Sequence, residues 1–312
     1  HSLDRRQRQM CIRDRNVRTR IFDNPMKALA LTLAILVPFG SVASPQLEEI
    51  LGPSSGLTCP FGVAFDNQDN AYIAEYEGGR ILLLDRNGKL LTLSGDGTKG
   101  YAGDGLNAEQ GVFHGMHNVA RASNGVLYVS DTHNNLVRKI DRKNILSTLA
   151  GVPEEKGFSG DGALANQAKL DTPISISLTP DEKSLLIADI RNRRVRAVDL
   201  ASGIISTVAG NGKRGKPRDG KPTLNQPLMD PRAAVMDDAG NLYILERNGH
   251  ALRVVRPNGK IYTLAGTGKK GRKDGPAIQA TFNGPKHLCL DGKGRIIICL
   301  LYTSPSPRDR SI

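Results

Sequence analysis

The sequence predicts an all-β fold, a β-propeller of four-stranded blades. A unit recurs with an Asp-Gly pair at its start, at steps of 57, 58 and 55 residues. Each unit holds four short β-prone runs separated by turn residues, and no segment after residue 43 has helical periodicity over a helical length. Repeats of this size with four strands each are typical of propellers, because radial stacking covers faces that one small sheet leaves exposed.

Each unit opens with a loop, of which "YAGDGLNAEQGVFHGM" (Tyr101–Met116) and "FSGDGALANQAKLDTP" (Phe158–Pro173) are two copies. The loop aspartates are Asp104, Asp161, Asp219 and Asp274. The aligned position that ends the loop is Pro60, Met116, Pro173, Pro231 or Pro285, and the acid fifteen or sixteen residues later is Glu75, Asp131, Asp189 or Glu246.

These eight acids are expected to be structural. Glycine beside the loop aspartate permits positive φ, and the carboxylate can accept bonds from nearby backbone amides. Calcium needs six to eight oxygens, and one carboxylate per loop supplies too few. The second set is expected to cap a turn or to pair with the following arginines, Arg80, Arg138 and Arg194.

The two ends differ from the repeats. Residues 1–25 and 300–312 show no strand or helix period, and we interpret them as a non-native leader and tail that resemble translated adapter sequence. Residues 26–43 have a basic start, twelve apolar residues and a small-residue site, which predicts a signal peptide cleaved after Ala43. The protein is therefore expected to be secreted or periplasmic. The apolar run is too short to span a bilayer, so no transmembrane segment is expected after cleavage.

The propeller is predicted over residues 44–299 as an incomplete ring. In the fifth copy Leu300 stands where an acid is expected, so the chain would hold about four and a half blades and be truncated at its C-terminus. Leu47–Leu51 is expected to be a lone outer strand of the last blade. A structure should then show an open ring.

The segments "LYVSDTHNNLVRKID" (Leu127–Asp141) and "LLIADIRNRRVRAVD" (Leu185–Asp199), with the Gly-Asp-Gly loops, resemble NHL-repeat propellers. The sequence is similar, more distantly, to gluconolactonase-like and senescence-marker propellers. The resemblance implies a six-bladed ring in the full-length protein. It also implies that an enzyme of this kind would hold a divalent cation at the axis, with Glu, Asn and Asp in gluconolactonase-like enzymes or three His in amidating lyases.

The residues expected at the axis are those that follow the aligned position at the start of each innermost strand. They are Phe61, His117, Ile174, Arg232 and Lys286. This column has no carboxylate and one His, so we predict no metal and no cofactor; a divalent cation is expected only if the protein is an enzyme. Arg232 and Lys286, with His117 and His287, are instead candidates to hold an anionic ligand by charge-assisted bonds. His114 and His133 lie in loops and receive no role.

Two loops carry a basic patch, consisting of Lys213, Arg214, Lys216, Arg218, Lys269, Lys270, Arg272 and Lys273. The formal net charge is +12, and a basic patch favours acidic partners. Acidic polysaccharide, a small anion or an acidic protein surface are the expected partners. Nucleic acid is not expected, because no aromatic residues stand among these lysines for base stacking and the chain is predicted to be exported.

Three functions remain open from the sequence. The first is an exported scaffold that binds an anionic ligand or partner on the face that carries the blade-to-blade loops. The alternative is a gluconolactonase-like hydrolase or lyase on the same fold, and a third is a sensor domain of a larger receptor. Cys59, Cys289 and Cys299 are odd in number and irregularly spaced, so they predict buried apolar residues and no disulfide framework.

Overall fold

The computed structural model describes residues 55–291 and 293–300. Within them, strands form antiparallel sheets in which, with one exception, strands paired in a sheet are neighbours in the chain. The predicted strand Leu47–Leu51, the predicted leader and signal peptide, and the tail from residue 301 lie outside the described residues.

The first sheet contains β1 (Pro60–Phe65), β2 (Ala71–Glu75), β3 (Ile81–Leu84) and β4 (Leu90–Ser94). The second contains β5 (Met116–Arg121), β6 (Leu127–Asp131), β7 (Leu136–Ile140) and β8 (Leu146–Ala150). The third contains β9 (Pro173–Leu178), β10 (Ser184–Asp189), β11 (Arg194–Asp199) and β12 (Ile205–Ala209). The fourth contains β14 (Pro231–Met236), β15 (Leu242–Glu246), β16 (Ala251–Val255) and β17 (Lys260–Ala265), with the short β13 (Lys221–Pro222) paired to β17.

A further sheet of two strands, β18 (His287–Leu290) and β19 (Ile296–Cys299), follows the fourth. Short 3₁₀ turns lie in the loops between sheets: η2 (Ala108–Gln110), η4 (Ala165–Gln167), η5 (Thr223–Asn225) and η6 (Ala277–Gln279). Another, η3 (Thr132–Asn134), joins β6 to β7. The sequence did not predict these turns, which are too short to show a helical period.

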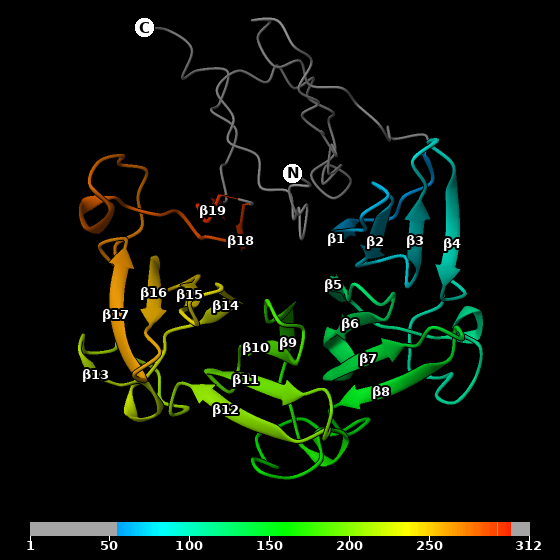
Figure 1. Ribbon diagram of the computed structural model, residues 1–312, viewed down its shortest axis with the longest axis horizontal. Coiled ribbons are helices and arrows are strands. Elements are labelled where there is room, and N and C mark those ends of the chain that lie inside the picture. The colour runs from blue at the N-terminus through cyan, green and yellow to red at the C-terminus, as the bar shows by residue number, and fades with distance from the viewer. Residues whose placement is uncertain (1–54, 292, 301–312) are drawn as a thin grey trace, which may run out of the picture.

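The sheets are arranged around a common centre, with β1, β5, β9, β14 and β18 innermost and β4, β8, β12 and β17 toward the outside, the short β13 lying beyond β17 (Figure 1). This arrangement confirms the β-propeller, and the described residues form four blades and the start of another. Figure 1 shows no described strand between β18 and β1, so the described part of the ring is open. The six-bladed closure and the truncation stay predictions.

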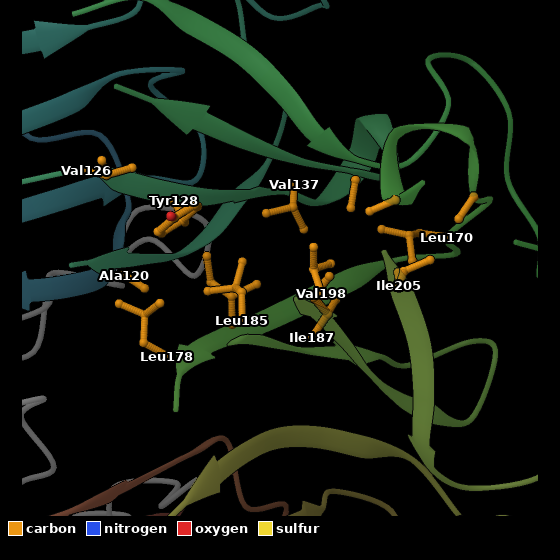
Figure 2. Close-up of a cluster of buried hydrophobic side chains, with 14 of the residues drawn as sticks. Ala120, Val126, Tyr128, Val137, Leu170, Leu178, Leu185, Ile187, Val198 and Ile205 are labelled. Carbon is orange, nitrogen blue, oxygen red and sulfur yellow. The ribbon is translucent and has the colours of Figure 1, made fainter. Parts of the chain in front are cut away.

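The blades pack face to face through apolar side chains that alternate along the strands. Between the second and third blades, Val137 faces Val198 and Ile187, and Tyr128 lies above Leu185 (Figure 2). All five side chains are buried. Burying such aliphatic side chains contributes about 1.5–3 kcal/mol each, so the interfaces between blades hold the ring together.

The Asp-Gly loop fastens the outer strand of the blade that follows it. Asp104 accepts bonds from the backbone and hydroxyl of Thr148 in β8, at 3.2 and 2.7 Å, and the Gly105 amide donates to the carbonyl of Leu146. Asp161 binds Thr207, and Asp219 binds Thr263, at the same place in the next blades. Asp274 is exposed, and the described residues after its loop hold two strands, β18 and β19.

Glycine is required at position 103, before the aspartate of the second blade's loop. Gly103 has φ +94°, and a Cβ there would lie 2.9 Å from the carbonyl oxygen of Gln110. A side chain would therefore be strained by its backbone and would also clash.

The second set of acids lies at the ends of β2, β6, β10 and β15, fully buried. Each accepts a backbone N–H from the loop that leads into its blade, at 2.6–2.9 Å; the donors are Thr58, His114, Asp171 and Met229. Each also faces an arginine: Arg80, which precedes β3, and Arg138, Arg196 and Arg253, which lie in β7, β11 and β16.

One predicted pairing is wrong. Asp189 faces Arg196, at 3.8 Å, and not Arg194. Arg194 lies at the strand end, where its guanidinium stacks 3.6 Å from the centre of the Phe158 ring and donates to the carbonyls of Asn192 and Asn211. Arg196 lies two residues further along β11 and is fully buried, so it is the guanidinium that the buried carboxylate meets.

The three described cysteines are free. Cys289 is buried, as expected, whereas Cys59 and Cys299 are half-buried.

Candidate functional site

The starts of the inner strands converge on one face of the ring, which we call the loop face. It is formed by the loops between sheets and by the β2–β3, β6–β7, β10–β11 and β15–β16 loops, because antiparallel strands return alternate connections to the same side. Tyr76 in the β2–β3 loop contacts His117 at the start of β5 and His133 in the β6–β7 loop. Segments far apart in the sequence therefore meet on this face.

Three of the predicted axial residues are brought together through Phe61. The Phe61 and His117 ring centres are 4.8 Å apart, and the guanidinium carbon of Arg232 is 6.0 Å from the Phe61 ring centre. Arg232 Nε donates to the carbonyl oxygen of Lys286 at a long 3.4 Å. Ile174 is buried at the start of β9.

Arg232, Arg247 and Lys286 form a cationic group that we call the axial cluster. Arg232 is only 4% exposed. Burial, followed by the charge of Arg247, lowers the pKa of Arg232 to about 10. Burial, followed by Arg247 and Arg232, lowers the pKa of Lys286 to about 8. Like charges that are buried close together favour a bound anion, because the anion offsets both their mutual repulsion and their loss of hydration.

Asp230 is a carboxylate that acts on Arg232, and it only partly offsets the positive charge of the axial cluster. Burial raises its pKa, against the opposing effect of Arg232, Arg247, Arg193 and Arg214. Its carboxylate accepts a bond from the Asn248 side chain at 2.7 Å. One acid among so many bases leaves an excess of positive charge.

The two predicted histidines differ from the sequence interpretation, which grouped them with the cations. Burial, followed by the charge of Arg232, lowers the pKa of His117 to about 3 and that of His287 to about 4. Both are therefore neutral at neutral pH. His117 Nδ1 lies 3.1 Å from the carbonyl oxygen of Gly115, which makes Nδ1 the protonated nitrogen.

Sequence reasoning missed a group of rings beside the axial cluster. We call it the aromatic cluster; it consists of Phe61, Tyr76, His114, His117 and His133. Their centres are 4.7–6.4 Å apart, mostly edge to face, and the Tyr76 hydroxyl lies 3.1 Å from His133 Nε2. One signal in the sequence could have predicted this cluster: Tyr76 and His133 closely follow Glu75 and Asp131, in equivalent loops of neighbouring blades.

The histidines of the aromatic cluster contact one another through their rings. Among the described residues, no three His, Cys, Asp or Glu side chains are grouped so that they could hold a metal ion.

The part of the chain that the structure describes has no helix long and apolar enough to cross a membrane.

The predicted basic patch lies on the loops at 211–221 and 266–275, and all eight of its side chains are exposed. The first loop is close enough for Arg214 to influence the pKa of Asp230. Lys270 in the second loop has the same kind of effect on His250. The first loop of the patch therefore lies near Asp230, and the second lies near His250 in the β15–β16 loop.

No protein-family model matches the sequence. The chain is 26% identical to Protein SUPPRESSOR OF QUENCHING 1, chloroplastic, of Arabidopsis thaliana, over 84% of this chain and 26% of that protein. It is 27% identical to NHL repeat-containing protein 2 of Gallus gallus, over 78% of this chain and 45% of that protein. The chain thus spans less than half the length of these relatives.

A solved structure of similar fold is an auxiliary nutrient binding protein from Bacteroides ovatus, with a TM-score of 0.56 and 20% identity over 77% of this chain and 56% of that one. A protein of unknown function from Bacteroides thetaiotaomicron has a TM-score of 0.51 and 18% identity over 79% of this chain and 68% of that one. The repeats and the blades define the class of this protein, which is a β-propeller, and its similarity to NHL repeat-containing protein 2 supports repeats of the NHL type.

Proposed function

We propose that this propeller is a binding scaffold that holds an anionic ligand at the axial cluster. The observation that carries the proposal is Arg232. Its guanidinium is almost fully buried beside two further cations, and its one described hydrogen bond is the long contact to the Lys286 carbonyl. A buried arginine normally has several good partners, so this guanidinium has donors to offer an anion.

The other features agree with this role. The excess of bases over Asp230 favours anions, and the exposed basic loops extend the positive surface outward. The Bacteroides ovatus structure of similar fold is an auxiliary nutrient binding protein, which is a precedent for ligand binding by a protein of this fold. We infer the same kind of role here, in a protein that is exported through residues 26–43 and acts outside the cytoplasm.

Binding of citrate, measured by isothermal titration at low ionic strength, tests the proposal. Arg232→Met and Lys286→Met should each weaken binding about tenfold or more, since a charge-assisted hydrogen bond contributes roughly 1.5–3 kcal/mol. Lys143→Met is the matched control, because Lys143 is exposed in the β7–β8 turn, at the opposite ends of the strands. Equal affinities in wild type, Arg232→Met and the control would refute the proposal.

A thermal melt of each variant shows whether the fold is retained. Arg232→Met removes a buried charge with weak partners, so we expect the variant to melt at or above the wild-type temperature. A loss of citrate binding by a variant that melts normally is then a loss of the site itself.

A further inference from the structure

The axial cluster and the aromatic cluster are two halves of one surface. Phe61 of the aromatic cluster connects them, because its ring centre lies 4.8 Å from that of His117 and 6.0 Å from the guanidinium carbon of Arg232. An anion bound to Arg232 therefore lies next to a set of rings. A small inorganic anion would use only the cationic half.

We propose that the natural ligand is a uronate, a sugar acid whose carboxylate binds Arg232 and Lys286 while its ring packs against the aromatic cluster. The inference deepens the proposed function and rests on it. Sugar rings present C–H groups on their faces, which pack on aromatic side chains, and a uronate carries one carboxylate at the edge of that ring. The carboxylate of a uronate matches the axial cluster, and its ring matches the aromatic cluster, most of whose side chains are half-buried.

The polar atoms among the rings favour a sugar over a purely aromatic acid. The Tyr76 hydroxyl and His133 Nε2 lie 3.1 Å apart, so a hydroxyl and an imidazole sit together beside the ring faces. Neutral imidazoles and phenols both donate and accept hydrogen bonds, as sugar hydroxyls do. His133 is exposed and Tyr76 half-buried, so both are within reach of a ligand.

A second observation favours a chain of uronates over a single one. Further basic side chains lie near the axial cluster: Arg193, in the β10–β11 loop of the third blade, and Arg214, in the exposed basic loop at 211–221, both favour the charged form of Asp230, which precedes Arg232 by two residues. A polyuronate carries one carboxylate per ring, so its successive units can meet these successive cations.

The test is calorimetric titration of the wild-type chain with sodium acetate, D-galacturonate, trigalacturonate and neutral D-galactose. We expect galacturonate to bind at least tenfold more tightly than acetate or galactose, because only it uses both halves of the surface. Trigalacturonate should bind more tightly still.

Variants separate the two halves. Tyr76→Leu and His133→Ala should weaken galacturonate binding about fivefold or more and leave acetate unchanged, whereas Tyr262→Leu, a half-buried tyrosine in the outer strand β17, should change neither. Arg214→Met should weaken trigalacturonate but not galacturonate, with Lys143→Met as the control.

The outcomes distinguish this inference from the proposed function. Acetate and citrate could bind through Arg232 while galacturonate binds no more tightly than acetate and Tyr76→Leu has no effect on its affinity. In that case the uronate proposal is wrong and the proposed anion site stands. If galactose binds as tightly as galacturonate, the carboxylate has no part in recognition and the inference is also wrong. If none of the anions binds, both proposals fail.

Discussion

Replacing Arg138 by Met should destabilise the second blade more than any surface change. Its guanidinium is fully buried, lies 2.6 Å from Asp104 and 3.4 Å from Asp131, and donates to the carbonyl of Ala102 at 3.1 Å. Removing one partner of a buried ion pair costs about 3–5 kcal/mol, because the other charge is left without compensation. We expect Arg138→Met to lower the free energy of unfolding by that amount at pH 8.

The loss should depend on pH in a defined direction. Burial raises the pKa of Asp131 to about 6 even with Arg138 present. Without the guanidinium this carboxyl is protonated in the folded state and ionised in the unfolded one, so stability falls as the pH rises. The cost of Arg138→Met should therefore be smaller at pH 5 than at pH 8.

Urea denaturation followed by circular dichroism measures these differences. Arg142→Met is the control, because Arg142 is exposed in the β7–β8 turn. A double-mutant cycle with Asp131→Asn isolates the pair, and the double variant should lose less than the sum of the single variants. A cost equal to that of the control, or strict additivity, would refute the reasoning.

Three further predictions follow from the same structure. Gly103→Ala should lower the melting temperature, because the backbone there has φ +94° and a Cβ would lie 2.9 Å from a carbonyl; an unchanged melt would show that the loop can relax. Burial raises the pKa of Asp189 to about 7, so its neutral form contributes stability that is fully present below about pH 4 and is lost as the pH rises toward 7. Relative to Asp189→Asn, the free energy of unfolding of the wild type should fall by up to roughly 1.4 kcal/mol per pH unit in that range. Parallel pH profiles of the two proteins would contradict this. EDTA should leave citrate affinity unchanged, whereas salt at about 0.5 M should weaken it strongly; the reverse pattern would indicate a metal site of the enzyme type.

The fold could be predicted because its information is repeated. The Asp-Gly loops, the acids such as Asp131 and the strand-turn spacing recur in successive units, so each copy supports the interpretation of the others. The contacts of Asp104 with Thr148 and Arg138 explain why this loop recurs. Equivalent contacts from the loop aspartate to a threonine hold the fourth strand in the second, third and fourth blades.

The site could be predicted only in part, because its residues differ between blades. Arg232 and Lys286 were found from their place at the start of inner strands. The aromatic cluster was missed because Tyr76 and His133 come from loops whose approach depends on the ring geometry, which no local pattern encodes. The neutral state of His117 was missed for a similar reason, since burial and nearby cations set its pKa.

The most direct test of the anion site is the pKa of Lys286, measured by NMR titration of the protein with ¹³C-methylated lysines and assigned with Lys286→Arg. In the free protein the pKa should be about 8, depressed by burial and by the charges of Arg247 and Arg232. Saturating citrate should raise it, because the bound anion favours the charged amine. A pKa that is the same with and without citrate would contradict an anion bound at this cluster.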